Sequence, residues 1–230
     1  LKAVHELSEQ QAVTVRASYY DETSQVTYSG LTLAEWQADP YQNPFRNDEM
    51  DAQRFGTSVT HRFALSPAVT FTTNAYYTYF NRDWWRQSSN SAQRPNDASD
   101  PVCAGMANLL TTCGNEGRLR QFWTAGLEPR VSMQHGLFGV DNVAEAGVRY
   151  HFEDQFRIQA NGDTPSARDP GTGRNAGIRE DSDRTVEAMS AFVQNRFDFG
   201  RWTVTPGVRF EHVDYERTDN LTGATGESTV

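Results

Sequence analysis

The feature that most constrains this chain is a two-residue alternation of apolar and polar side chains in several long segments. In RWTVTPGVRFEH, residues 201–212, the parity of Trp202 is apolar and the parity of Arg209 is mostly polar. Successive side chains of an extended chain point to opposite faces, so this period predicts a β-strand with one apolar and one polar face. The pattern gives about seven strands of roughly 9 to 13 residues. They lie around 11–20, 52–64, 68–80, 118–134, 142–152, 186–199 and 201–212.

The expected connections between these strands alternate in length. Short ones lie at 64–68, 135–141 and 199–201, and long polar ones at 21–50, 81–117, 154–184 and from 216 onward. In an up-and-down antiparallel sheet every second connection lies at the same end, so one end has tight turns and the other has loops of about 30 residues. Transmembrane β-barrels combine short periplasmic turns, long extracellular loops and strands that alternate between lipid and lumen. We therefore predict an all-β fold, an antiparallel up-and-down transmembrane β-barrel.

Two other classes of protein fit part of this pattern. A soluble β-sandwich could bind a ligand or a partner through its long loops, and an outer-membrane enzyme or adhesin could use the same kind of barrel. The sandwich is disfavoured because the aromatic side chains would need a second apolar face to pack against, and the sequence offers none. Solubility without detergent would separate the sandwich from both barrels.

The parity of the last segment assigns its two faces. The face of Val204 and Val208 is expected to contact lipid, and the face of Arg209 and Glu211 is expected to line a polar lumen. Pro206 lies within this segment and has no N–H to donate to a neighbouring strand. We therefore expect a bulge or a local break in pairing at Pro206.

Composition narrows the partners. With 30 acidic and 21 basic side chains the formal charge is -9, which disfavours nucleic acid. Despite a mean hydropathy of -0.70, 12% of the residues are aromatic, which indicates a folded chain rather than a disordered one. No run approaches the roughly 18 to 20 apolar residues of a membrane-spanning helix, which excludes a helical membrane protein but not a β-barrel.

The chemistry-bearing residues are few. Cys103 and Cys113 have no His or Cys at zinc-like spacing, so we predict a disulfide between them and an oxidising compartment. The sequence has no GxSxG, HExxH or GK[ST] motif, and its five histidines are spread over different segments. We therefore expect no enzymatic activity, no metal site and no cofactor.

Four stretches carry a resemblance to a known family. They are DPYQNPFR (39–46), FWTAGLEPRVS (122–132), AEAGVRYHFED (144–154) and AFVQNRFDFGRWTVTPGVRFEH (191–212). They are similar to segments of the TonB-dependent outer-membrane siderophore receptors, most closely the ferric citrate receptor branch. The resemblance implies a barrel of about 22 strands around a folded plug, in the outer membrane of a Gram-negative bacterium. It also implies binding of a ferric siderophore, which is released inward when the TonB energy-coupling complex pulls on the plug.

The chain covers only part of that pattern. It begins without Met and without signal-peptide features, and it shows no plug and no energy-coupling sequence. About seven strands would also form an open sheet, whose unpaired edges are costly in lipid. We therefore expect 1–230 to be a segment of the barrel domain, with the plug absent from this chain.

The resemblance directs attention to arginines as ligands for an anionic ferric chelate, first of the citrate type. The guanidinium fork matches carboxylates, and Arg46 and Arg130 match regions that line the vestibule of the ferric citrate receptor. Arg46 could instead be a solvated loop charge, and Arg130 could pair with Glu128 or with a neighbouring strand. Other arginines flank the second long loop and cannot be ranked: Arg82, Arg86, Arg94, Arg118 and Arg120. A receptor of the same family for another siderophore, such as a catecholate, or for a cofactor is the alternative.

Overall fold

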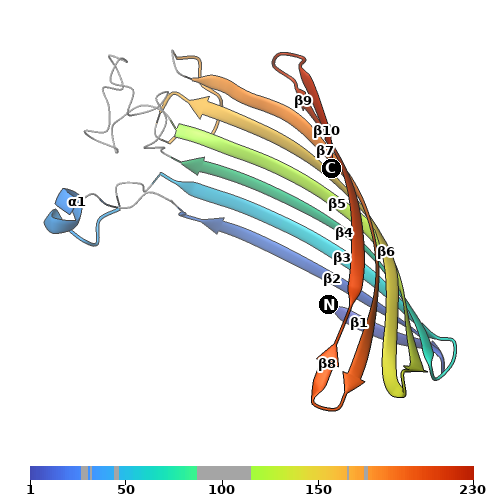
Figure 1. The fold of residues 1–230 in the computed structure, drawn as a ribbon. Helices are drawn as coiled ribbons and strands as arrows, with labels where there is room; N and C mark the ends of the chain where they lie inside the picture. The colour runs from blue at the N-terminus through green and yellow to red at the C-terminus, as the bar shows by residue number, and fades with distance from the viewer. Residues whose placement is uncertain (27–30, 32, 44–46, 87–114, 165, 174–175) are drawn as a thin grey trace.

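A computed structural model shows one continuous, curved antiparallel sheet (Figure 1). The structure describes all residues except 27–30, 32, 44–46, 87–114, 165 and 174–175. Strands follow one another across the sheet in chain order, from β1 to β7 and then β9 and β10, while the short β8 also pairs with β7. This arrangement confirms the expected all-β, up-and-down antiparallel fold.

Ten strands and one short helix make up the described part of the chain. The strands are β1 Lys2–Ser8, β2 Gln11–Ser24, β3 Glu49–Ala64, β4 Val69–Arg86, β5 Asn115–Leu137, β6 Val140–Gly162, β7 Gly177–Phe199, β8 Trp202–Val204, β9 Gly207–Asp219 and β10 Thr225–Thr229. The helix α1, Leu33–Ala38, lies within the connection from β2 to β3, where the sequence predicted only a loop.

The central strands are longer than predicted. β5, β6 and β7 have 23 residues each, which at about 3.3 Å per residue is roughly 75 Å. A strand of about 9 to 11 residues is long enough to cross the hydrocarbon of a membrane, so each of these strands is about twice that length. The expected loop at 154–184 therefore shrinks to residues 163–176. Near the long connections β7 carries polar side chains on both faces, whereas on β6 the alternation is interrupted only at Asp154 and resumes with Phe156 and Ile158.

The end of the chain also differs from the prediction. β9 continues to Asp219, and β10 pairs back against it, so that only residues 220–224 connect the two strands. The side chain of Asp219 accepts hydrogen bonds from the backbone N–H groups of Leu221 and Thr222, and Gly223 has a φ of 71°. The predicted long loop from residue 216 onward is therefore wrong. An aspartate and a glycine form a tight turn there.

Three of the four tight turns at the opposite end agree with the prediction, whereas the turn at 9–10, which joins β1 to β2, was not expected. Residues 9–10, 65–68, 138–139 and 200–201 connect successive strands. Phe138 and Gly139 both have positive φ, 59° and 74°, which is the backbone of a type I′ hairpin turn. Figure 1 shows these turns gathered at one end of the sheet and the long connections at the other.

One face of the sheet is an exposed apolar band. The pairing register places Val208 beside Val193, and Val193 beside Ala146. Val208 is 67% exposed and Val148 is 53% exposed. Among the described residues only three apolar side chains are buried, so no second layer covers this face. The predicted parity of the faces is confirmed, and the packed core that a β-sandwich requires is missing from the described part of the chain.

The predicted break at Pro206 is confirmed as a gap in pairing. β8 ends at Val204 and β9 begins at Gly207. Val204 pairs with Phe197 and Val208 pairs with Val193, so the register is the same on both sides of the gap and no residue is inserted. The alternative of a bulge is therefore wrong.

Candidate anion site on the polar face

A row of arginines crosses the polar face near the end of the sheet with the long connections. Arg82 on β4 lies directly opposite Arg120 on β5, and Arg120 lies directly opposite Arg157 on β6. One row further toward the middle of the sheet, Arg184 on β7 lies opposite Arg217 on β9. Like charges directly opposite each other on one face destabilise a sheet. This arrangement therefore lowers the stability of the unliganded protein.

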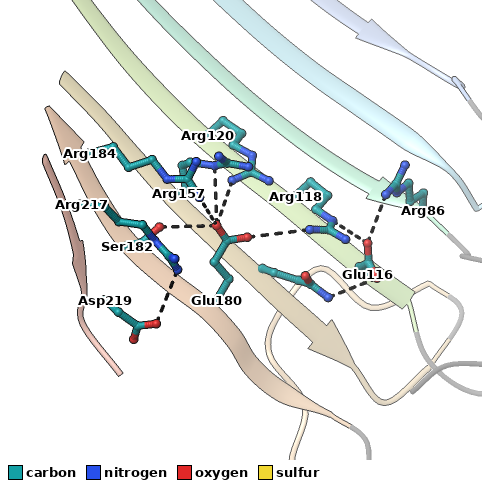
Figure 2. A network of polar contacts seen from close by, with 11 residues as sticks. Arg86, Glu116, Arg118, Arg120, Arg157, Glu180, Ser182, Arg184, Arg217 and Asp219 are labelled. Atoms are coloured by element: carbon teal, nitrogen blue, oxygen red, sulfur yellow. Dashed lines mark hydrogen bonds and ion pairs between the residues drawn. The ribbon is translucent and has the colours of Figure 1, made fainter. Parts of the chain in front are cut away.

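Two more arginines complete what we call the arginine cluster. Its members are Arg82, Arg86, Arg118, Arg120, Arg157, Arg184 and Arg217, and Figure 2 labels all of them except Arg82. Long neighbouring strands bring these side chains together although up to 135 positions separate them in the sequence. The cluster therefore depends on the register of five strands and not on one local motif.

Two carboxylates lie among these guanidinium groups. Glu116, whose side chain is 2% exposed, binds Arg118 at 2.6 Å and Arg86 at 3.2 Å. Its second oxygen accepts a hydrogen bond from the amide of Gln159 at 3.2 Å. Glu180 lies within ion-pair distance of four arginines, and the outlying Arg217 pairs with Asp219 at 3.5 Å (Figure 2).

Positive charge exceeds negative charge in the cluster, and part of it is poorly satisfied. Seven guanidinium groups lie beside three carboxylates. Arg120 is only 6% exposed, and its Nη1 has no hydrogen-bond partner among the described residues. Within the same ranges the buried Nε atoms of Arg82, Arg157 and Arg184 also have none. Buried donors without partners are costly, so the cluster is suited to accept an anion.

The connection from β6 to β7 is anchored beside the cluster. Asn115 donates a hydrogen bond to the carbonyl of Ala167 at 3.1 Å, and Arg168 binds the carboxylate of Glu49 at 3.3 Å. Asp163 accepts backbone N–H groups from two residues of the same loop, Thr172 and Gly173, each at 2.8 Å. These hydrogen bonds hold the pKa of Asp163 below its usual value.

A second polar network lies on the same face, closer to the tight turns. The phenol oxygen of Tyr76 on β4 bonds the Nδ1 of His151 on β6 at 2.7 Å and accepts a hydrogen bond from Arg149 at 2.8 Å. Arg149 also pairs with Glu128 at 3.0 Å. Tyr76 reaches across β5 because the residue beneath its ring is Gly126, where a Cβ would lie 2.3 Å from the ring. The charged side chains of this network pair with side chains of opposite charge, so the network stabilises the sheet and does not attract an anion.

The structure separates Arg130 from the arginine cluster. Arg130 lies on the polar face, as predicted, but ten positions along β5 from Arg120, or roughly 33 Å. Its guanidinium lies 3.4 Å from Glu128 and 5.8 Å from the ring centre of Phe192, and its side chain is 58% exposed. These contacts match the alternative of a structural pair with Glu128, while a role in ligand binding stays a prediction.

Several predicted residues lie outside the described part of the chain. They are Arg46, Arg94, Cys103 and Cys113. Four members of the arginine cluster had been named from the sequence without a ranking: Arg82, Arg86, Arg118 and Arg120. Arg157, Arg184 and Arg217 were missed. All three lay within expected loops, at 154–184 or from 216 onward, and a parity count continued along β6 and β7 would have placed Arg157 and Arg184 on the polar face.

A metal-binding cluster and a membrane-spanning helix are both absent from the described residues. In those residues no three or more His, Cys, Asp or Glu side chains are placed to share a metal ion. Within the same limits, no helix has the length and hydropathy needed to cross a membrane.

Comparisons with solved structures agree with this fold. The ferric citrate transporter FecA in its unliganded form superposes with a TM-score of 0.79 at 21% identity, over 99% of this chain and 31% of that one. The siderophore receptor PiuA from Acinetobacter baumannii gives 0.70 at 12% identity, over 99% and 37%. The ferric-catecholate import receptor Fiu from K12 E. coli, in its closed form, gives 0.62 at 7% identity, over 99% and 37%.

At these identities the structural comparisons show the fold alone, and the chain spans 31–37% of the length of those structures. The sequence itself matches a family model over residues 4–229, described as TonB dependent receptor-like, beta-barrel. Because this match includes almost every residue, the chain belongs to the TonB-dependent receptor β-barrel family.

Proposed function

We propose that this chain is the part of an outer-membrane TonB-dependent receptor that binds an anionic ferric siderophore, most favourably a citrate-type chelate. The observation that carries the proposal is the row formed by Arg82, Arg120 and Arg157. Three like charges directly opposite one another lower the stability of the empty sheet, and a bound anion would remove that cost.

The chemistry of the cluster favours carboxylates. Arginine presents its N–H donors in a planar fork that fits a carboxylate with two parallel hydrogen bonds. The buried donors without partners on Arg120 and Arg157 are spread over adjacent strands, which suits a ligand with several anionic groups. FecA is named as a ferric citrate transporter, which agrees with this choice, although at 21% identity that likeness carries only the fold.

The remaining expectations belong to the same proposal. They include an outer-membrane location in a Gram-negative bacterium, a barrel of about 22 strands, a plug, and coupling to TonB. Arg46 and Arg130 remain predicted ligands. Cys103 and Cys113 remain a predicted disulfide.

Binding to the complete receptor in detergent tests the proposal. Arg120→Gln should weaken binding of ferric citrate by a factor of about 10 to 100, since a hydrogen bond to a charged group contributes about 1.5 to 3 kcal/mol. Its thermal stability should be unchanged or higher, because Arg120 faces two other arginines. Arg62→Gln is the matched control, since Arg62 lies on the same face near the tight turns.

The comparison ligands decide between the alternatives. Ferric citrate should bind more tightly than a ferric catecholate, and raising the salt concentration should weaken binding. Preference for the catecholate would favour the alternative siderophore. Equal affinities for ferric citrate in the Arg120→Gln, Arg62→Gln and wild-type receptors would contradict the proposed site.

A further inference from the structure

We infer that Glu180 is an internal substitute for the ligand: its carboxylate occupies the centre of the arginine cluster when no anion is bound, and an incoming anion displaces it. The inference rests on the proposed function, because it assigns to Glu180 the selectivity of the same site. It makes Glu180 a specificity-determining residue rather than a ligand.

The position of Glu180 among the arginines is the first observation. Its Oε1 lies 3.2 Å from Arg184, 3.7 Å from Arg120 and 3.7 Å from Arg157. Its Oε2 lies 3.8 Å from Arg118 (Figure 2). The four partners come from β5, β6 and β7 and converge on this one side chain. An anion that bridges those three strands would have to use the same space.

The lengths of these contacts are the second observation. Hydrogen bonds from guanidinium groups to carboxylates usually measure about 2.7 to 2.9 Å, and three of the four contacts of Glu180 exceed this by almost 1 Å. By contrast, Glu116 holds Arg118 at 2.6 Å. Glu180 is therefore shared among four cations and satisfies none of them fully, whereas Glu116 is a firm structural partner.

The donors that Glu180 leaves unsatisfied form the third observation. The Nη1 of Arg120 and the Nε atoms of Arg157 and Arg184 are buried and have no hydrogen-bond partner in the described ranges. One carboxylate offers only two oxygens, so it cannot reach all of these groups. A ligand with several carboxylates could, and would gain hydrogen bonds that Glu180 does not make.

The backbone at Glu180 is the fourth observation. Glu180 pairs with Gln159, but the next pair joins Ile178 to Ala160, so that Arg179 is an extra residue on β7. An extra residue of this kind is a β-bulge, which redirects a side chain and interrupts the ladder. Glu180 thus follows directly after a break near the start of β7. It can move without unpairing the strand beyond it.

Displacement of Glu180 sets a threshold for binding. A singly charged anion replaces one carboxylate by another of equal charge and gains little. A multiply charged chelate replaces Glu180 and also satisfies the donors that it leaves without partners. The carboxylate therefore selects for ligands of high negative charge and lowers the affinity for every anion.

Two variants of the complete receptor test the inference. Glu180→Gln removes the competing charge, so ferric citrate should bind about tenfold more tightly than to the wild type. Inorganic sulfate should also raise the melting temperature of Glu180→Gln more than that of the wild type. Glu145→Gln is the control, because Glu145 lies on the same face near the tight turns and is held by Gln194 at 2.7 Å.

Glu180→Asp keeps the negative charge but shortens the side chain by one methylene group, which moves the carboxylate away from the arginines. Sulfate should stabilise this variant more than the wild type and less than Glu180→Gln. If Glu180→Gln does not fold, Glu180→Asp decides the question by the same measurement. Equal or smaller stabilisation by sulfate than in the wild type would overturn the inference, and so would weaker binding of ferric citrate to Glu180→Gln. If the wild type does not bind ferric citrate but the sulfate series follows the expected order, the proposed ligand is wrong and the role of Glu180 holds.

Discussion

Substituting arginine for Val148 probes the apolar face at its centre. On β6 the apolar parity runs from Ala144 to Phe152, and Val148 is its midpoint. Val148 is 53% exposed and lies opposite Ala191 on β7, on the same face. In a bilayer its surroundings are hydrocarbon, so an arginine there should lower the free energy of unfolding by about 2 to 4 kcal/mol.

Ala144 provides the matched position. It lies on the same face and strand, four residues closer to the tight turn at 138–139. Four residues correspond to about 13 Å along the strand, which at a tilt of about 40° is a depth change of roughly 10 Å. Near the interface the same substitution costs about 0 to 1 kcal/mol. Val148→Arg should therefore cost at least about 1 kcal/mol more than Ala144→Arg.

The measurement is denaturant unfolding of the complete receptor in lipid vesicles, followed by tryptophan fluorescence. The apolar face of a soluble protein would resist arginine as well, so a large cost at Val148 alone is not decisive. The dependence on depth is decisive, because only a bilayer makes the middle of the strand the most distant point from water. Equal costs at Val148 and Ala144 would refute the assignment of this face to lipid.

Three further predictions concern the connections. Asp163→Asn should loosen residues 163–176 and increase their cleavage by a protease. The pKa of Asp163 is lowered in the folded protein, so its contribution to the wild-type loop is present at neutral pH. The wild-type loop should therefore lose its protection from the protease only as the pH falls below about 4. Single cysteines in 163–176 should react with a membrane-impermeant reagent on intact cells, whereas those at 138–139 should not, and the reverse labelling would invert the topology. Cys103 and Cys113 should appear as one disulfide-linked peptide in an unreduced digest, with a stabilisation of about 2 to 3 kcal/mol, and two free thiols would exclude it.

The sequence was informative wherever the two faces of the sheet carry side chains of different polarity. Val204 and Val208 could be assigned to one face from the order of the residues alone, because an extended chain places every second side chain on the same face. The gap at Pro206 has a different local cause, which is the missing backbone N–H of proline. These features depend on single residues and their nearest neighbours in the chain.

The ends of the long strands could not be predicted, because the pattern of apolar and polar side chains changes there. On β7 both faces carry polar side chains near the long connections, as with Asp183 and Arg184, and on β6 Asp154 interrupts the apolar parity, so the expected strands ended too early. Arg157 was therefore counted as a loop residue. The arginine cluster also requires the register between β4, β5 and β6, and nothing local in the sequence specifies which residues of distant strands lie opposite each other.

The contact of Tyr76 with β6 acts on the sheet as a whole. Its side chain passes over Gly126 and bonds His151, so it links two strands that are not neighbours. A slide of β4 by two residues along β5 would keep every side chain on its proper face, and hydrophobicity alone would not oppose it. It would, however, carry the ring of Tyr76 from Gly126 onto Thr124 or Glu128, whose side chains would block it. Gly126 thus leaves room for the ring of Tyr76 at only one of these registers, and the alignment of the distant arginines depends on that register.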